Sequence, residues 1–149
     1  MRLPPGLHPV IVRRAAATDA AVLAELQGLE PGKLAAWAEW IATHAETHLP
    51  FVGEVDGHVV AAAWLHIAER VPRNDAFDRR CGDVQSVMVR EDYRNQGIGA
   101  ALITAILAEA ETRNLTHVTV HSSRRAVDFY LRHGFSHHRQ LLIWQQHGH

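Results

Sequence analysis

Cysteine is almost absent from this 149-residue chain: Cys81 stands alone, which excludes a disulfide within the chain. A single thiol suits a reducing compartment. No run of about 18 apolar residues occurs either, so the sequence offers no membrane-spanning helix. Residues 1–9 lack the apolar core of a secretory signal. We therefore expect a cytoplasmic protein with no membrane partner.

Lysine is as scarce as cysteine, since Lys33 is its single instance, and the formal net charge is −1 at pH 7. Nucleic-acid-binding proteins usually carry a basic excess, so we expect no nucleic-acid partner. The 12 histidines could suggest a metal. However, the sequence contains neither an HExxH motif nor a Cys/His ligand frame, and we expect no metal site.

The remaining composition is that of a soluble globular protein, with 47% hydrophobic and 21% charged residues. A chain of this length can bury about two-thirds of its unfolded surface in one core. No repeat, low-complexity tract or linker divides the sequence. We therefore expect a single domain over residues 1–149.

Hydrophobic periodicity and turn residues predict alternating strands and helices. Asp56-Gly57 predicts a tight hairpin turn, because both of its central residues need positive φ. The segment 83–89 has apolar residues on both faces, Val84 and Met88 on one and Val87 and Val89 on the other, which favours a buried central strand. The expected elements are a strand at 10–14, a helix after Asp19 that ends before Pro31, a helix at 34–45, a hairpin over 51–69, a loop at 71–82, a strand at 83–89, a helix at 98–113, a strand at 116–122, a helix at 124–134 ended by Gly134, and one or two strands within 135–146.

This order predicts an α/β layered domain, and it places a glycine-bearing turn between a strand and a helix. The first N–H groups of a helix lack intrahelical partners and carry partial positive charge, so they can bind an anion. Gly97 and Gly99 remove side chains at that point, and Arg94 adds a charge. Neither a P-loop nor a dinucleotide motif fits, since the loop has no lysine and no third glycine. A purely structural role, tight packing of strand against helix, is an equal alternative.

The loop and a second block downstream together resemble the GCN5-related N-acetyltransferase (GNAT) family. The acyl-CoA motif of that family, (Gln or Arg)-x-x-Gly-x-(Gly or Ala), is matched by Arg94-Asn95-Gln96-Gly97-Ile98-Gly99. The second block usually begins Asn-x-x-Ala and continues to a Tyr and a Gly-Phe pair. Here it reads Ser123-Arg124-Arg125-Ala126, Phe129-Tyr130 and Gly134-Phe135. The resemblance extends from Val10 to about Gln145.

The resemblance implies a single mixed, twisted sheet of about six or seven strands flanked by helices, with splayed central parallel strands. It also implies acetyl-CoA as cosubstrate, with its pyrophosphate on the loop and its pantetheine arm along the backbone of Met88 and Val89. An N–H group near Val89 would stabilise the oxyanion of the tetrahedral intermediate. Ser123 replaces the usual Asn. The residues assigned to the coenzyme are Met88, Val89, Arg94, Asn95, Gln96, Gly97, Ile98, Gly99, Ala100, Ser123, Ala126 and Tyr130.

Acetyl transfer to an amine needs a base and an acid, because an alkylammonium with a pKa of about 10.4 must lose a proton and the departing thiolate gains one. Tyr130 matches the family residue near the thioester sulfur; its alternative role is a core aromatic beside Phe129. Asp83 is the candidate base, with Gln85 orienting a water. Asp83 would serve equally well as a solvated residue at the head of its strand.

Three histidines on expected strands, His66, His117 and His121, could titrate near neutral pH but are better explained as structural. Trp37 and Trp40 fall in the helical segment that caps the acceptor cleft in relatives.

The expected function is an enzyme, an acetyl-CoA-dependent N-acetyltransferase acting by direct attack in a ternary complex. Its acceptor would be a primary amine on a small molecule or protein, and a homodimer is possible. The alternatives are a non-catalytic acyl-CoA-binding regulatory module and a domain that uses the loop for ATP or NAD.

Overall fold

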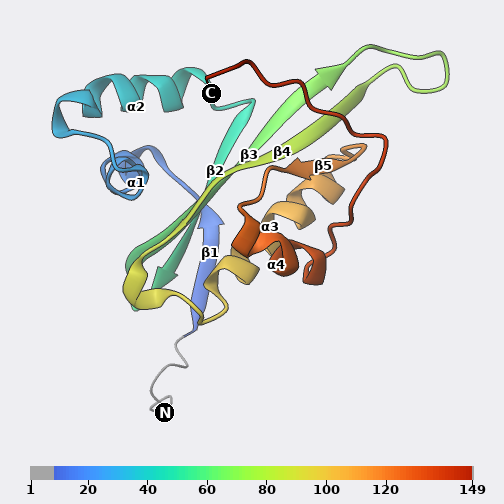
Figure 1. Cartoon of the computed structure of the whole chain (residues 1–149). Coiled ribbons are helices and arrows are strands. Elements are labelled where there is room, and N and C mark those ends of the chain that lie inside the picture. Colours follow the sequence, from blue (N-terminus) through green and yellow to red (C-terminus); the bar gives the residue numbers. More distant parts are fainter. Residues whose placement is uncertain (1–8, 149) are drawn as a thin grey trace.

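The structure, a computed structural model, describes residues 9–148. One mixed sheet forms its centre, with strands in the order β1-β2-β3-β4-β5; the first four are antiparallel and β5 runs parallel to β4. Helices α1 and α2 cover one face, and α3 and α4 cover the other (Figure 1). The elements are β1 (Val10–Arg14), α1 (Ala20–Gln27), α2 (Leu34–Thr43), β2 (His48–Val55), β3 (His58–Arg70), β4 (Arg79–Val89), α3 (Ile98–Thr112), β5 (Val118–Val120) and α4 (Val127–Arg132), with short 3-10 turns at Ala17–Asp19, Pro31–Lys33, Glu91–Tyr93 and Arg124–Ala126.

Local sequence signals explain the ends of several elements. The hairpin turn between β2 and β3 has φ of 52° at Asp56 and 78° at Gly57, which confirms the expected turn. Gly134, with φ of 98°, follows α4 and confirms the expected helix end. The loop expected at 71–82 is shorter in the structure. Residues 79–82 belong to β4, because they pair with residues 67–70 of β3.

Two apolar layers hold the sheet. On the α3 side, residues such as Leu65, Leu102, Ile103 and Ile106 are fully or almost fully buried. On the α1–α2 side a smaller cluster surrounds Trp64 and includes Leu23, Val52 and Ala62. A buried side chain of this size contributes about 1.5–3 kcal/mol to folding, so the α3 layer supplies most of the apolar stabilisation.

A β-bulge in β4 changes the side-chain alternation that the sequence predicted. Trp64 pairs with Gln85 and Ala62 with Met88, so two residues, Ser86 and Val87, oppose a single residue of β3. Ser86 has φ of 52°. As a result Val84, Val87 and Val89 all pack toward the α3 layer, whereas the sequence analysis placed Val84 on the face opposite Val87 and Val89.

Strands β4 and β5 separate soon after they meet. Their parallel pairing spans three positions, from Gly82 with Val118 to Val84 with Val120. Beyond it, β4 turns away through the bulge and β5 leads into the segment before α4. The sheet therefore opens into a V between two parallel strands, as expected for the fold class.

The strands expected within 135–146 are absent from the structure, so the sheet has five strands in the described part of the chain instead of six or seven. After α4 the chain runs as an extended segment along the side of the molecule (Figure 1). Apolar residues lie exposed on this segment: Leu141, Leu142, Ile143 and Trp144, at 64–86%. The apolar sequence of residues 141–144 favours a strand. However, β5, the neighbouring edge strand of the predicted order, is only three residues long and offers few main-chain groups for pairing.

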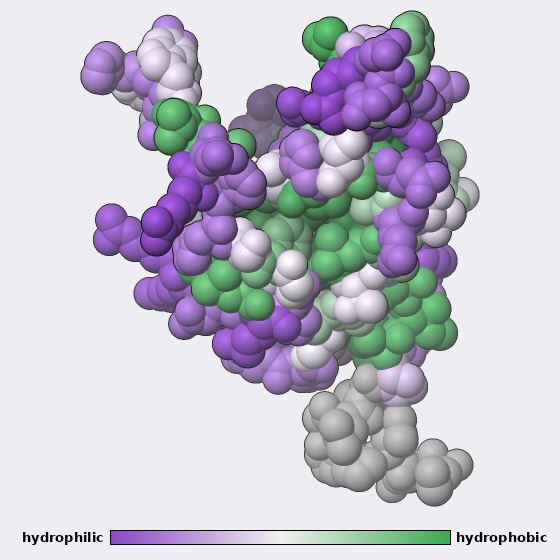
Figure 2. Space-filling view, turned by 90° about the vertical axis from the view of Figure 1, so that its right-hand side faces the viewer, coloured by the Kyte–Doolittle hydropathy of each residue, from purple (hydrophilic) through white to green (hydrophobic). Residues whose placement is uncertain are grey.

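Figure 2 shows the same side of the molecule as a surface, with hydrophobic residues gathered in a hollow between polar rims. Among residues 9–148, no helix combines the length and apolar character that crossing a bilayer requires.

Candidate functional site

The loop between β4 and α3 is shaped by left-handed backbone at two positions, Asn95 with φ of 62° and Gly97 with φ of 81°. Gly97 is the N-cap of α3, and no side chain hydrogen-bonds to the free N–H groups of that helix end. The Gln96 amide donates back to the Asp92 carbonyl at 3.2 Å. The resulting concave run of N–H groups, at the positive end of a 15-residue helix, can hold an anion.

The two glycines of this loop are not required by packing. A Cβ atom on Gly97 would meet no atom within 4 Å, and one on Gly99 would meet only Phe129, at the ordinary contact distance of 3.7 Å. The left-handed φ explains glycine at position 97 but not at position 99. The bare backbone at Gly99 therefore favours the approach of a ligand over the alternative of tight strand-to-helix packing.

A cleft of about 310 Å³ occupies the opening between β4 and β5. We call it the β4–β5 cleft. It brings the second sequence motif against β4, since it is bounded by the bulge of β4 on one side and by the start and body of α4 on the other. Its lining residues are Val84, Ser86, Val87, Val120, His121, Ser122, Ser123, Ala126, Phe129 and Tyr130.

Main-chain groups of β4 face the open side of the V at Val89. The Arg90 N–H bonds to Val60 on β3 at 2.8 Å, so by strand alternation Met88 also faces β3 and Val89 faces away from it. The Val89 carbonyl accepts a hydrogen bond from Arg94 Nε at 3.3 Å. Of the two residues assigned to the pantetheine arm, Val89 thus presents its backbone to the opening, whereas the Met88 backbone pairs with Ala62.

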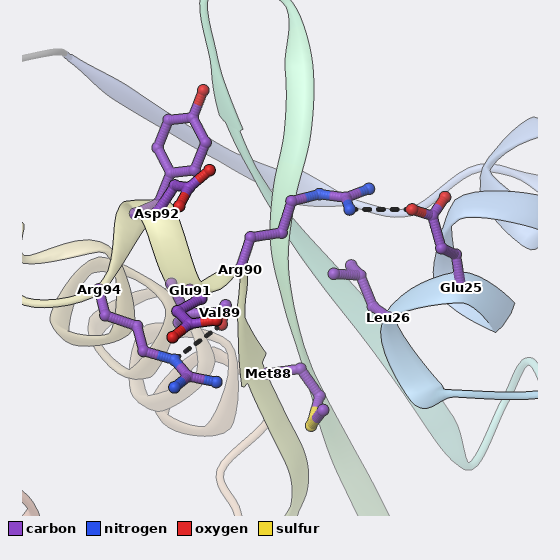
Figure 3. A pocket seen from close by; sticks show the side chains of 9 residues that line it. Glu25, Leu26, Met88, Val89, Arg90, Glu91, Asp92 and Arg94 are labelled. Carbon is purple, nitrogen blue, oxygen red and sulfur yellow. Dashed lines mark hydrogen bonds and ion pairs between the residues drawn. The ribbon is translucent and has the colours of Figure 1, made fainter.

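A second cleft of about 430 Å³, the α1 cleft, lies between α1 and the β4–α3 connection (Figure 3). Met88, Val89 and Arg94 line it. At its rim Arg90 Nη1 lies 2.9 Å from Glu25 Oε1, and this contact lowers the pKa of Glu25. The ion pair links the end of β4 to α1 across the cleft.

Tyr130 is 8% exposed and packs edge-on against Phe129 and Phe135. Burial raises the pKa of its phenol above the ordinary value of 10.0, because a phenolate would lose its hydration. The side chain therefore keeps its proton at neutral pH while lining the β4–β5 cleft. This combination suits a proton donor to a leaving thiolate.

Asp83 and Gln85 lie on the α1–α2 face of β4, the face opposite Val84, and neither lines the β4–β5 cleft. The Asp83 carboxylate is fixed at both oxygens: Thr119 Oγ1 donates to Oδ1 at 2.7 Å, and Gln85 Nε2 donates to Oδ2 at 3.0 Å. Gln85 thus orients Asp83 directly. Asp83 is partly exposed, so a water or an amine can still reach its carboxylate.

The other residues assigned to the coenzyme take distinct positions. Ile98 is 3% exposed and belongs to the core, so only its backbone can face a ligand. Ala126 is half-buried in the β4–β5 cleft, and Ser123 is exposed there. Ser123 is the N-cap of the turn before α4 without a side-chain cap bond. The structure describes no group of three or more His, Cys, Asp or Glu side chains arranged to hold a metal.

Sequence reasoning missed the bulge at Ser86 and Val87, which shapes the mouth of the β4–β5 cleft. A serine in left-handed conformation carries no sequence signal comparable to glycine. It also missed the contact of α1 with this mouth, where Gln27 Nε2 donates to Ser86 Oγ at 3.3 Å.

A family model described as Acetyltransferase (GNAT) family matches residues 16–135. The chain belongs to this family. Its motif resemblance is thereby confirmed. A glucosamine 6-phosphate N-acetyltransferase of Trypanosoma brucei brucei is 30% identical over 94 residues, 62% of either chain, so this GNAT chain matches less than two-thirds of that relative's length.

Solved structures share the fold over nearly the whole chain. An acetyltransferase of Trypanosoma brucei superposes with a TM-score of 0.79 at 23% identity, covering 93% of this chain and 100% of its own. A predicted acetyltransferase of Clostridium acetobutylicum, solved with acetyl-CoA, superposes with a TM-score of 0.73 at 17% identity, covering 92% of this chain and 96% of its own. At these identities the likeness shows the GNAT fold.

Proposed function

We propose that the protein transfers the acetyl group of acetyl-CoA to a primary amine by direct attack in a ternary complex. The observation that carries this proposal is the bare, uncapped start of α3 at Gly97 and Gly99, which lies at the end of β4 beyond the β4–β5 cleft. A pyrophosphate on the N–H groups of Gln96 to Ala100 would leave the pantetheine arm free to follow the open edge of β4. Arg94 would add a charge-assisted contact to the phosphates.

The chain's own residues supply both proton transfers. Asp83, held by Thr119 and Gln85, would accept the ammonium proton directly or through a water. Tyr130 would donate its proton to the departing thiolate. A positioned acid or base contributes about 10²–10⁴ in rate. The N–H group of Val89, which faces away from β3, would stabilise the oxyanion, and losing one such donor costs about 10²–10³ in rate.

Turnover separates this proposal from a non-catalytic acyl-CoA-binding module. The assay incubates the purified chain with acetyl-CoA and a panel of amines and measures free thiol, with the amines omitted as control. The panel includes glucosamine 6-phosphate, because the sequence relative is named for it. Thiol release that depends on an amine supports the transferase; tight binding of acetyl-CoA without release from any amine supports the regulatory module.

Thermal unfolding with acetyl-CoA, ATP and NAD separates the coenzyme from other phosphate ligands. A ligand at about 100 times its Kd stabilises the folded state by about 2.7 kcal/mol. We expect this gain with acetyl-CoA. A gain with ATP or NAD alone would instead support a nucleotide-binding domain.

We also propose that the protein is cytoplasmic and forms a homodimer. A cytoplasmic location agrees with the lone, half-buried Cys81. A homodimer is supported by the exposed apolar segment at residues 141–144, which has no packing partner among the core clusters of the described chain.

A further inference from the structure

A continuous row of aromatic and imidazole rings lies on the α1–α2 side of the sheet. Its members come from α2, the turn after it, β2 and β3. Trp40 stacks on His44 at 4.3 Å between ring centroids, and His48 stacks on His66 at 4.4 Å. Edge contacts at 5.0–6.0 Å connect the rest. We call this set the aromatic row: Trp37, Trp40, His44, His48, Trp64 and His66.

The aromatic row ends beside Asp83. His48 pairs with His66 across β2 and β3, and His66 pairs with Asp83 across β3 and β4. Directly opposed side chains on one face of a sheet have Cβ atoms about 4.5–5.5 Å apart. Asp83, the proposed proton acceptor, therefore lies directly beside His66, the last ring of the aromatic row. Trp40, at the other end, is 38% exposed, so the row is accessible from solvent.

One imidazole of the aromatic row, that of His48, is held in its uncharged form at neutral pH. Burial lowers the pKa of His48, and the neighbouring His66 and His44 lower it further. Phosphate recognition relies on Arg or Lys. Two arginines on this side pair with carboxylates instead: Arg13 with Asp19 and Glu54, and Arg90 with Glu25. Arg70 and Arg79 oppose each other four residues further along β3 and β4, and Arg79 donates to the Val71 carbonyl. A phosphorylated acceptor would find few free cations here.

We propose that the acceptor is a cationic amine attached to an aromatic or apolar body, with its ammonium at Asp83 and its body against Trp40, His48 and His66. Ring faces attract both apolar groups and cations, and a carboxylate attracts the ammonium. This inference rests on the proposed function and specifies its substrate class. It places the phosphorylated amino sugars outside that class.

The transfer balances within this arrangement. The ammonium gives a proton to Asp83 or its water, and the free amine forms a bond from nitrogen to the acetyl carbon. As the bond from that carbon to the coenzyme sulfur breaks, the sulfur takes the proton of Tyr130. The nitrogen, protonated again by its attack, releases its second proton, which returns through water to the Tyr130 phenolate, and the first proton passes from Asp83 to solvent. The products are the N-acetyl amine and free coenzyme A.

The test compares phenethylamine, tryptamine, propylamine and glucosamine 6-phosphate as acceptors in the thiol-release assay. We expect kcat/KM for the two aromatic amines to exceed that for glucosamine 6-phosphate at least 10-fold. Trp40→Ala should raise the KM for phenethylamine about 10-fold, leave the KM for acetyl-CoA unchanged, and change the propylamine kinetics little. Trp40→Phe, which keeps a ring, should restore most of the affinity.

Phe77→Ala is the matched control, because Phe77 is an aromatic residue 80% exposed on the β3–β4 connection, outside both clefts. Calorimetric titration of phenethylamine into the coenzyme-bound chain gives a readout that does not need turnover. Binding without turnover would leave the acceptor class standing and overturn the transferase proposal. Absence of phenethylamine binding, or preferential use of glucosamine 6-phosphate, would overturn the acceptor class while amine-dependent turnover upheld the transferase.

Discussion

Tyr130, the proposed acid, is a single residue whose burial bears directly on that proposed role. Its hydroxyl is protonated at neutral pH, and burial beside Phe129 and Phe135 raises its pKa further. We expect Tyr130→Phe to lower kcat about 10²-fold or more while the KM for acetyl-CoA stays nearly constant. Steady-state kinetics and circular dichroism of both proteins check this. An unchanged kcat in the folded variant would assign the acid to another group.

A second residue, Asp19, makes the fold sensitive to acid. It is 7% exposed and accepts hydrogen bonds from Arg13 at 2.7 and 3.0 Å and from the Ala16 N–H at 2.7 Å. The Arg13 guanidinium, more than the Ala16 N–H, lowers the pKa of Asp19. The unfolded chain then binds this proton at a higher pH than the folded chain, so the stabilisation is complete above about pH 4 and is lost as pH falls through the folded pKa.

We expect Asp19→Asn to lower the free energy of unfolding at pH 7 by about 1–3 kcal/mol and to flatten its decline between about pH 5 and 3. Urea unfolding at several pH values measures both effects. Asp78→Asn is the control, since its side chain is 83% exposed and makes only a loose contact of 3.6 Å with Arg80. Equal behaviour of the two variants would contradict the role of the Arg13–Asp19 pair.

At the scale of elements, the start of α3 combines a stable helix end with the proposed coenzyme site. A glutamate in the first helical turn is favourable to the helix, because it opposes the positive end of the dipole. Gly99→Glu should therefore keep the fold and lose at least 100-fold in acetyl-CoA affinity through charge and steric conflict with the pyrophosphate. Calorimetric titration of acetyl-CoA measures the loss.

Gly32→Glu controls for the added charge, because Gly32 is exposed and a Cβ there would meet no atom within 4 Å. If Gly99→Glu binds acetyl-CoA as tightly as this control does, the pyrophosphate lies elsewhere.

The elements also show how far sequence reasoning reaches. The turn at Asp56-Gly57, the helix over 98–112 and the loop glycines follow local rules, so they could be predicted from residue type and spacing. The bulge at Ser86 depends on how β4 pairs with β3 and then leaves β5, which is tertiary information. The positions of Asp83 and Tyr130 on different sides of β4 follow from that pairing as well.

At the scale of the whole molecule, the exposed apolar segment at 141–144 is the feature for which packing within one copy gives no reason. Four consecutive large apolar residues are 64–86% exposed, although such surface usually marks an interaction site. In the described chain β5 pairs with β4 alone, so this edge of the sheet is open, and the same chain carries an exposed segment of high strand propensity. In a dimer, the apolar segment of each copy could pair with the open sheet edge of the other copy.

We expect the protein to be a dimer at tens of micromolar, and Leu142→Glu to make it monomeric, because a charge at the centre of an apolar contact loses its hydration. Light scattering after size exclusion measures the mass of each. Phe77→Glu places the same charge on another exposed apolar site, at the β3–β4 connection, and should remain dimeric. A monomeric wild type would show that the segment does not join two copies, and dissociation by Phe77→Glu alone would move the interface to the β3–β4 connection.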